Sequence, residues 1–323
     1  MTQWRPVSGP ETAMCRAKIL RRLREYFDSE SVIEVDTPAL SFAAVSDVQI
    51  ESLSVSSALS DVPLYLHTSP EFCMKRLLAA GYPDVYSICR VFRDGESGRH
   101  HQPEFTMVEW YRLGFQLSEI IADTIAAIAQ ALGDRAPGEP VAVVQYQAVF
   151  VDVLGFDPMT ATIETLAKAA DADADLSKAL GDERDDWLDL LLATQIAPTF
   201  ATNKLTVMKH YPASQAALAR LCPDKPQFAD RFEVFMGSVE LANGYVELTD
   251  AKVQADRIAD DQAQRKRRGL AERPHDEFLI DALESGLPSC AGVAMGLERL
   301  HMMHDKTDDI RDVIPFVFEN KNG

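Results

Sequence analysis

The sequence predicts a fold of the α+β class, because antiparallel strands and amphipathic helices are expected in separate segments. Three segments carry this prediction: a strand–loop–strand pair at residues 86–111, a helix at residues 11–30, and two strands leading into a helix at residues 227–257. In the strand pair, apolar and polar residues alternate on both sides of a turn-rich loop. In the helix, apolar residues recur at the spacing of one helical face.

Length and composition limit the class of protein. The chain has 323 residues and is 46% hydrophobic, enough for one large domain or two small ones. No run of eighteen apolar residues predicts a transmembrane helix, and residues 1–14 lack the pattern of a signal peptide. The five cysteines show no CxxC spacing, which is typical of reduced thiols. We therefore expect a cytoplasmic protein without membrane contact.

The charge balance argues against a nucleic-acid partner. The formal net charge is −18, whereas a nucleic-acid-binding surface needs Lys and Arg to neutralise phosphates. One basic run, RKRR at residues 265–268, ends a predicted helix. We interpret it as a solvated helix C-terminus, where positive charges suit the helix dipole.

The strand–loop–strand segment carries the clearest candidate chemistry. Its loop contains Gly95, Gly98 and Pro103, and loops of this length in hairpins are usually functional. Arg93 lies at the base of the loop and offers a planar set of donors for phosphate or carboxylate. Glu109 and Tyr111 come two residues apart on the returning strand, so they share one face. The segment thus offers a cation for an anionic group and a carboxylate for a cationic one.

The segments before this pair are a helix, a strand and a second helix. The helix at residues 11–30 leads into a strand at residues 31–40 that ends in Thr-Pro. Residues 64–81 predict a strand and then a helix, with Ser69 as N-cap and Pro70 in the first helical position. Glu71 then lies in the first turn, where the helix dipole alone favours a carboxylate.

The middle of the chain carries little recognisable chemistry. We expect a helix at residues 117–132, a linker at 133–140 and a strand-like run at 141–155. The segment from 158 to 198 is helical and rich in Ala, Asp and Leu, and a strand follows it. We interpret residues 158–225, approximately, as a helical insertion on the surface of a single domain spanning residues 1–323.

Acidic residues lie along the two strands that we expect within residues 227–257. Glu233 and Glu240 are placed to meet a cation. Asn243, Tyr245 and Glu247 alternate along the second strand and share one face. A charge on the inner face of a strand is unfavourable unless it is paired. Glu247 is therefore either exposed or holding a cation.

A glycine-punctuated segment at residues 289–300 predicts a buried strand entering a helix. Gly292 and Gly296 allow close approach of the backbone to a ligand. Arg299 lies in the first helical turn, where the dipole disfavours a positive charge. A nearby anion, such as a triphosphate, relieves that repulsion.

These motifs resemble those of class II aminoacyl-tRNA synthetases. FRDGESGRHHQPEFTMVEWY at residues 92–111 is similar to motif 2 of the lysyl type, and CAGVAMGLERL is similar to motif 3. The helix, strand and Thr-Pro before them resemble motif 1, and the tail DDIRDVIPFVFEN resembles the lysyl-type ending. The resemblance runs from residue 11 to 318. It implies an antiparallel sheet of about six strands with flanking helices, in a homodimer.

The resemblance also implies a reaction and site residues. The substrate carboxylate attacks the α-phosphorus of ATP, with Arg93 holding the α-phosphate and carboxylate and Arg299 the γ-phosphate side. Glu233 and Glu240 hold Mg²⁺. Further ATP contacts are Asp94, Gly95, Glu96, His101, Gln102, Phe105, Glu240, Leu241 and Gly296. The amino-acid contacts are Ser69, Pro70, Glu71, Glu109, Tyr111, Asn243, Tyr245, Glu247 and Ala294. Several carboxylates and no competing local cation suit a substrate with two amino groups.

The acceptor follows from a second resemblance. Only about ten residues precede the motif 1 helix, so we expect no anticodon-binding domain and no tRNA. The arrangement is similar to the elongation factor P lysine ligases, which activate (R)-β-lysine and transfer it to a lysine of elongation factor P. Ala294 replaces the usual glycine and is hypothesised to bias the pocket toward the β-amino acid. Lysine activation with another acceptor, or a catalytically silent regulatory subunit, remains an alternative.

The motif 2 loop departs from the usual pattern at two positions. Gly95 occupies the position of the adenine-contacting Glu, for which Glu96 or the Gly95 backbone is expected to substitute. Gln102 replaces the usual Asn. Both changes concern adenine contacts rather than phosphate or lysine contacts.

Overall fold

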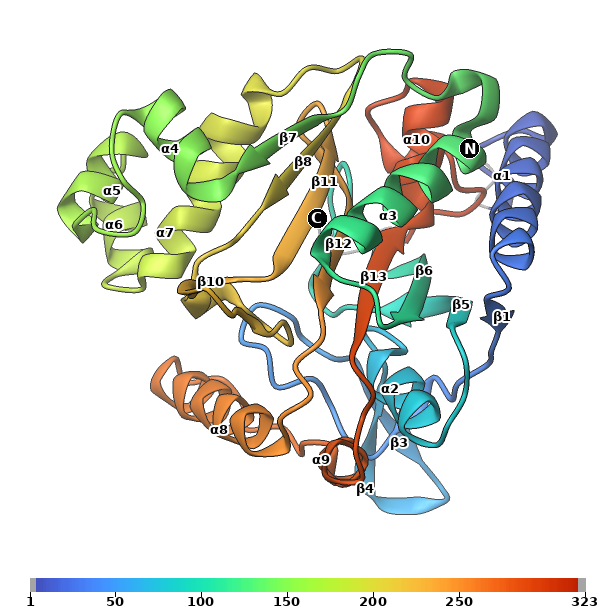
Figure 1. The fold of residues 1–323 in the computed structure, drawn as a ribbon, viewed down its shortest axis with the longest axis horizontal. Coiled ribbons are helices and arrows are strands. Elements are labelled where there is room, and N and C mark those ends of the chain that lie inside the picture. The colour runs from blue at the N-terminus through green and yellow to red at the C-terminus, as the bar shows by residue number, and fades with distance from the viewer. Residues whose placement is uncertain (1–3, 319–323) are drawn as a thin grey trace. The chain divides into compact units, whose positions relative to one another are not determined.

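The computed structural model describes residues 4–318 and divides the chain into two compact units. The first unit comprises residues 1–136 and 247–323, and the second comprises residues 137–246. In Figure 1 the two segments of the first unit are coloured blue to green and orange to red. The second unit has the colours between these, from green to orange. The last two residues of the DDIRDVIPFVFEN segment lie outside the described residues.

The first unit contains helices on both faces of a mixed sheet. Its helices are α1 (Pro10–Ser29), α2 (Glu71–Ala79), α3 (Leu117–Leu132), α8 (Ala251–Arg267), α9 (Glu277–Glu284) and α10 (Leu297–Asp305), with 3₁₀ turns η1 (Gly133–Arg135) and η5 (Ile310–Asp312). Its strands are β1 (Ile33–Glu34), β2 (Leu40–Ser41), β3 (Ser54–Ser57), β4 (Ser60–Leu66), β5 (Val85–Phe92), β6 (Glu104–Leu113) and β13 (Cys290–Gly296).

The main strands of the first unit pair in the order β1–β5–β6–β13, and β2–β4–β3 form a small separate sheet. Strands β5 and β6 are antiparallel neighbours, so the predicted strand–loop–strand pair is confirmed. Strand β13 pairs antiparallel with the other edge of β6, which places Ala294 opposite Glu109 and Gly292 opposite Tyr111. Strand β1 is parallel to β5. Glu109 therefore lies on a central strand.

The two faces of this sheet follow from strand alternation. On one face, Tyr86 and Trp110 are paired across β5 and β6, and Phe27 of α1 stacks on Tyr86 with ring centroids 4.3 Å apart. On the other face, Val85 and Tyr111 are paired and pack with apolar residues of α2 and α9. Because Glu109 shares a face with Tyr111, its side chain lies on the α2 side.

Helix α1 forms because its apolar residues meet the sheet. Ile19, Leu23 and Phe27 recur every four residues and are fully buried. Beside them, Asp123 of α3 accepts hydrogen bonds from the Tyr26 hydroxyl at 2.7 Å and from Trp110 Nε1 at 2.9 Å. This buried carboxylate joins α1, α3 and β6, whose ribbons are labelled in Figure 1.

The second unit contains short helices and a mixed sheet. Its helices are α4 (Tyr146–Leu154), α5 (Ile163–Ala169), α6 (Ala174–Leu180) and α7 (Arg184–Leu191), with the π-turn η2 (Leu192–Ile196) and the 3₁₀ turns η3 (Ala197–Thr199) and η4 (Ala213–Gln215). Its strands are β7 (Ala142–Gln145), β8 (Leu205–Lys209), β9 (Leu221–Cys222), β10 (Lys225–Ala229), β11 (Arg231–Met236) and β12 (Val239–Val246). Strand β11 pairs antiparallel with β8 and β12, and β7 is parallel to β8.

The α+β class is confirmed, and the details differ in two respects. Eight strands take part in the main pairings rather than about six, and β1 and β7 are parallel to their neighbours. The strand-like run at residues 141–155 is wrong beyond residue 145, because residues 146–154 form α4. A short apolar run does not distinguish a strand from a buried helix. Tyr146 and Phe150, one turn apart, are buried in the core of this unit.

The prediction that the RKRR run is solvated is wrong for its first residue. Arg265 is fully buried, and its Nη2 lies 2.5 Å from Glu51 Oε2. It also donates to the carbonyls of Asp47 and Ala271, so it joins the end of α8 to two loops. Among residues 4–318, no helix is long and apolar enough to cross a membrane.

Replacing Arg265 should destabilise the protein more than replacing its exposed neighbour Arg267. We expect Arg265→Met to lower the free energy of unfolding by about 2–3 kcal/mol, because it leaves Glu51 and the backbone carbonyls of Asp47 and Ala271 without this buried donor. Arg267→Met should change it by no more than about 0.5 kcal/mol. Urea unfolding measures both, and equal losses would contradict a structural role of Arg265.

Candidate active site

Three carboxylates gather beside the face of β6 that α2 covers, two of them buried and that of Glu71 half-buried. Glu71 is the first residue of α2, Glu109 lies in the middle of β6, and Glu247 comes shortly before α8. Glu109 is 2% exposed and accepts hydrogen bonds from Ser69 Oγ and the Tyr111 hydroxyl, each at 2.7 Å. The structure thus brings together most of the residues predicted to contact an amino acid.

The helix that carries Glu71 begins one residue later than predicted. Pro70 occupies the N-cap position, and Ser69 Oγ accepts a hydrogen bond from the Glu71 amide at 3.0 Å. Ser69 therefore fixes the first turn of α2 and orients Glu109 at the same time. Its hydroxyl thus joins the backbone amide of Glu71 to the carboxylate of Glu109, forty residues after Ser69 in the chain.

The expectation of no competing local cation is wrong. Lys75, one turn after Glu71 on α2, is 2% exposed. Its Nζ lies 2.6 Å from Glu71 Oε1 and 2.5 Å from Glu247 Oε2. The sequence offered the i, i+4 spacing of Glu71 and Lys75 as a signal, but the second partner, Glu247, is brought in only by the fold.

Burial dominates the electrostatics of this group. It raises the pKa of Glu109 to about 8, and the neighbouring charge of Glu71 adds to the effect. It also raises the pKa of Glu247 to about 8, against the opposing effect of Lys75. Burial lowers the pKa of Lys75, but Glu247 and Glu71 outweigh it and raise that pKa above its ordinary value, so the ammonium stays charged. Below pH 8, therefore, Glu109 and Glu247 retain protons, and a bound cation would displace them.

Oε1 of Glu247 has an acceptor position open to a ligand. The atom is buried, and no group within residues 4–318 donates a hydrogen bond to it. Buried carboxylate oxygens are normally satisfied, so such an atom is a candidate ligand contact. Ala294, opposite Glu109 in the strand register, lies on the same face of the sheet.

Gly292 also belongs to the site, and the sequence did not show why this position requires a glycine. A Cβ atom at this position would lie 2.5 Å from Glu247 Oε1 and 2.5 Å from Cε1 of Tyr111. Any side chain there must displace one of these two groups. The glycine therefore makes room for the carboxylate and the tyrosine ring, which are neighbours only in the folded sheet.

The motif 2 loop places a second set of predicted residues together. Nε of Arg93 is buried, and no described group accepts a hydrogen bond from it. The same guanidinium lies 3.5 Å from Glu96 Oε1 and 5.2 Å from the centre of the Phe105 ring. Gly95 has φ +77°, a left-handed conformation, and its amide donates to Asp94 Oδ1. Arg93 thus has a donor available for an anionic ligand.

Arg299 also reaches this loop. Helix α10 begins after Gly296, and Arg299 is its third residue. Its Nη2 lies 2.6 Å from His101 Nε2, and its Nε donates to the carbonyl of His100 at 3.4 Å. Gln102 is buried, and its Oε1 accepts from the amide of Phe318. Arg299 and the loop are therefore brought together.

The remaining predicted residues belong to the second unit. Glu233 on β11 lies opposite Asn243 on β12, and Arg231 contacts both, at 2.6 Å from Glu233 Oε1 and 3.1 Å from Asn243 Oδ1. Burial and the nearby charge of Glu240 raise the pKa of Glu233 to about 7. Tyr245 is half-buried and Leu241 is buried.

Glu233 and Glu240 have the chemistry of a magnesium site. Both offer carboxylate oxygens, the donors that Mg²⁺ prefers, and Glu240 lies close enough for its charge to help raise the pKa of Glu233. A cation between them would relieve this repulsion, although Arg231 already offsets part of it. Two carboxylates suit Mg²⁺ when phosphate and water supply its other ligands. The residues present therefore fit the ion.

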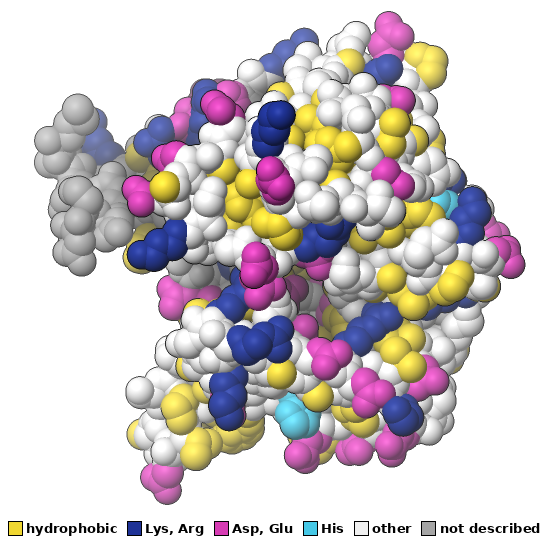
Figure 2. All heavy atoms as spheres, turned by 90° about the vertical axis from the view of Figure 1, so that its left-hand side faces the viewer, with side chains coloured by type: hydrophobic (Ala, Val, Ile, Leu, Met, Phe, Trp, Pro, Cys, Tyr) yellow, Lys and Arg dark blue, Asp and Glu magenta, His cyan; other side chains and the backbone are white. Residues whose placement is uncertain are grey.

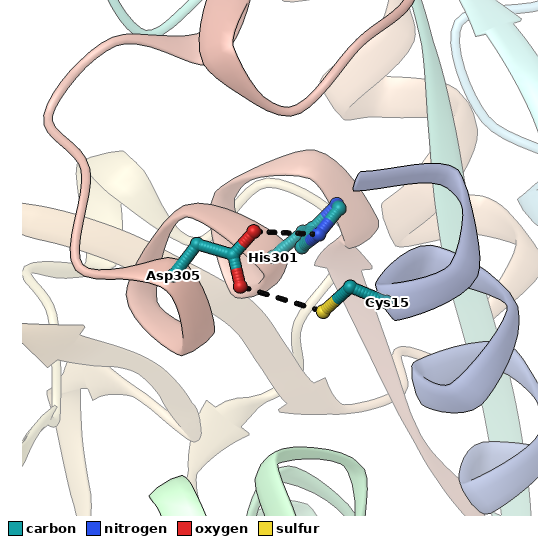
Figure 3. Close-up of side chains that lie close together, drawn as sticks. All are labelled: Cys15, His301 and Asp305. Atoms are coloured by element: carbon teal, nitrogen blue, oxygen red, sulfur yellow. Dashed lines mark hydrogen bonds and ion pairs between the residues drawn. The ribbon is translucent and has the colours of Figure 1, made fainter. Parts of the chain in front are cut away.

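Two other groups of side chains have the composition of metal ligands. In the first unit, Cys15 of α1 meets His301 and Asp305 of α10, as Figure 3 shows. Asp305 lies 3.4 Å from Cys15 Sγ and 3.2 Å from His301 Nε2. In the second unit, His210, Cys222 and Asp230 form a similar group. Neither group includes a residue predicted from the motifs.

A cavity of about 460 Å³ lies in the second unit. Residues of α4, including Gln147 and Val151, line one side, and His210, Lys225 and Phe228 line the other. None of the residues predicted to contact ATP or the amino acid lines it. The carboxylate group of the first unit, rather than this cavity, therefore carries the candidate chemistry.

Comparisons with known proteins agree with the motifs. A family model described as tRNA synthetases class II (D, K and N) matches residues 3–320. A protein of Pseudoalteromonas translucida (strain TAC 125), named elongation factor P–(R)-β-lysine ligase, is 44% identical over 319 residues, 97% of each chain. Proteins with the same name from Salmonella typhi and Vibrio atlanticus (strain LGP32) are each 41% identical over 98% of both chains. The chain belongs to the class II tRNA synthetase family, and to the branch of it that contains these ligases.

Proposed function

We propose that this protein activates (R)-β-lysine with ATP and transfers the β-lysyl group to the ε-amino group of a lysine on elongation factor P. The observation that carries the proposal is the group of three carboxylates beside β6, of which Glu109 and Glu247 are buried, with Glu247 Oε1 open to a further donor. Such a group favours a ligand with more than one positive charge. The names of the relatives supply the acceptor and the β-amino acid.

In the bound state, the two ammonium groups of the substrate lie among Glu71, Glu109 and Glu247. Tyr111 and Ser69 hold Glu109 in place through its two oxygens. The resemblance adds Asn243 and Tyr245 of the second unit as proposed amino-acid contacts. Ala294, on the face of Glu109, limits the space for the carbon chain and bears on the choice between α- and β-lysine.

Activation requires positioning and charge neutralisation rather than an acid or base. A carboxylate oxygen of the substrate attacks the α-phosphorus of ATP, a new P–O bond forms, and the bond to pyrophosphate breaks. Arg93 donates to the α-phosphate and the attacking carboxylate, for which its Nε is available. Arg299 stabilises the charge of the leaving pyrophosphate.

The other ATP contacts come from the motif 2 loop and β12. Phe105 is proposed to stack on adenine, with further contacts from Asp94, Gly95, Glu96, His101, Gln102 and Gly296 of the first unit. The resemblance adds Leu241 of the second unit as a contact. Mg²⁺, held by Glu233 and Glu240 with phosphate oxygens, would neutralise charge on the nucleotide. In the second step the ε-amine of the acceptor attacks the acyl carbon, AMP leaves, and the amine loses a proton.

The acceptor in this proposal is a protein rather than tRNA. Figure 2 shows Lys and Arg side chains interspersed with Asp and Glu over one face of the molecule, without a continuous basic surface. The chain as a whole has 50 acidic and 32 basic residues. Binding to tRNA depends on basic side chains that neutralise phosphates, and this composition does not favour it.

The protein is proposed to act as a homodimer. Met14 on α1 is 61% exposed, and Phe42 after β2 is 64% exposed. Met14 lies in the region that resembles motif 1, and Phe42 lies shortly after it. In class II synthetases motif 1 forms the dimer interface. Large exposed apolar side chains are typical of surfaces that bind a partner.

The first test is the intact mass of elongation factor P after incubation with this protein, ATP, Mg²⁺ and (R)-β-lysine. We expect a gain of one lysyl residue on elongation factor P and no charging of bulk tRNA in a parallel reaction. Exchange of pyrophosphate without modification of either acceptor would leave activation in place and reject elongation factor P. Absence of exchange would favour a catalytically silent subunit.

Binding of the diamino acid should strengthen as the pH rises toward 8.5. The pKa values of Glu109 and Glu247 are raised to about 8, so below that pH protons must leave before ammonium groups bind. Between about pH 7 and 8, the KM for lysine should therefore fall as the pH rises. Each proton that is released on binding contributes a decrease of up to about tenfold per pH unit. Stability of the ligand-free protein should fall over the same interval, because a raised carboxyl pKa stabilises only the protonated state.

Calorimetric titration in buffers of different ionisation enthalpy measures this proton release directly. A KM that is independent of pH, together with no net proton release, would contradict the ionisation of the carboxylates on binding.

Gly292→Ala should weaken amino-acid binding. The added methyl group displaces Tyr111 or Glu247, and overpacking of this kind typically costs about 1–3 kcal/mol. We therefore expect a higher KM for lysine in the ATP–pyrophosphate exchange assay, with a smaller change in the KM for ATP. Gly138→Ala is the control, since nothing lies near its Cβ position. Equal kinetics for the two variants would show that the space beside Gly292 is unimportant.

A further inference from the structure

Lys75 is an ionisable group of the site to which the proposed reaction assigns no part. It is buried, and its Nζ bridges Glu71 at 2.6 Å and Glu247 at 2.5 Å. A buried ammonium is unfavourable without a charged partner, and one carboxylate would satisfy that need. Lys75 instead contacts two of the three carboxylates that are proposed to receive the substrate.

The other groups around this cluster do not duplicate the charge of Lys75. The titratable side chains facing it are Glu109 and Tyr111 on β6, Cys89 on β5, Cys290 on β13, and Asp84 before β5. Burial raises the pKa of the Cys89 thiol to about 12 and also raises that of Cys290, so both thiols are neutral. Tyr111 donates a hydrogen bond as a neutral phenol. Among the described residues named in this paragraph, Lys75 is the one that carries a positive charge.

A count of charges shows what this cation does. Glu71, Glu109 and Glu247 carry three negative charges when ionised, and Lys75 reduces the total to two. Two is the number of ammonium groups on a diamino acid, whose carboxylate is directed to Arg93 instead. An amino acid with one ammonium group would leave a buried carboxylate without a counter-ion, which is strongly unfavourable.

We propose that Lys75 is a positioning and specificity residue of the amino-acid site: it holds Glu71 and Glu247 in place and sets the net charge of the pocket to match two ammonium groups. This inference rests on the proposed function, since it assumes a diamino acid as the substrate. It adds a fixed internal cation to the recognition of that substrate. Without Lys75, the three carboxylates would repel one another, turn away or retain additional protons.

The test compares Lys75→Met with Arg76→Met, a change at the next, exposed residue of α2. ATP–pyrophosphate exchange with (R)-β-lysine is measured from about pH 6.5 to 9, and thermal unfolding checks that each variant folds. We expect Lys75→Met to raise the KM for the amino acid about tenfold or more, with a smaller change in kcat. The pH midpoint of KM should move up by about one unit or more, because loss of a cation raises the pKa of the carboxylates. Arg76→Met should match the wild type.

Two further variants separate charge from structure. Lys75→Met combined with Glu71→Gln removes one positive and one negative charge, so it should return the pH midpoint toward the wild-type value while the KM stays high. Lys75→Arg keeps the charge in a bulkier group and should keep the midpoint while raising the KM. If Lys75→Met does not fold, Lys75→Gln carries the test, because it also removes the charge but keeps a polar side chain: its midpoint should move up, whereas a merely structural role of Lys75 predicts no relation between midpoint and charge.

The outcomes are distinguishable. Wild-type kinetics in Lys75→Met, or an unchanged midpoint in all three variants, would overturn the role of Lys75 and leave the proposed function intact. Tighter amino-acid binding by Lys75→Met would also overturn it, because Lys75 would then be a competitor for the carboxylates. Absence of lysine-dependent exchange in the wild-type protein would overturn both proposals.

Discussion

The buried ion pairs of Lys75 with Glu71 and Glu247 are the interaction on which the candidate site depends. They connect the first turn of α2 to the segment that enters α8, two parts of the chain more than 170 residues apart. Their geometry fixes two of the three carboxylates beside β6. Because charges buried together are unfavourable unless they are paired, every neighbour of the cluster has to be compatible with it. Gly292 and Ser69 show two ways in which this compatibility is achieved.

The sheet of the first unit supplies the framework for these contacts. Glu109 projects from β6 between two antiparallel neighbours, and Tyr111 and Ser69 hold its oxygens. On the opposite face, Phe27 and Asp123 lock the strands against α1 and α3. A strand with partners on both sides and a helix on each face has little freedom to move. Such rigidity suits a reaction that depends on positioning more than on acid–base chemistry.

The same cluster illustrates a conflict between stability and function. Three carboxylates share one buried region with a single lysine, and the pKa values of Glu109 and Glu247 are raised as a result. A core built for stability would replace this group with apolar residues of similar volume. Its presence is understandable if a cationic ligand completes the charge balance. The unfilled acceptor of Glu247 and the unfilled donor of Arg93 point to the two ends of one such ligand.

The sequence by itself determined the α+β class, the strand–loop–strand pair of β5 and β6 and the family, and it proposed most residues of the candidate site. These features depend on local alternation, on glycine and proline in turns, and on motifs whose residues are close in the chain. It misassigned α4, because a short apolar run is compatible with a strand and with a buried helix. It also treated Arg265 as a solvated charge, although its burial depends on Glu51. Only the tertiary structure decided that Lys75 pairs with Glu247 and that Gly292 makes room for Tyr111, because these contacts join residues far apart in the sequence.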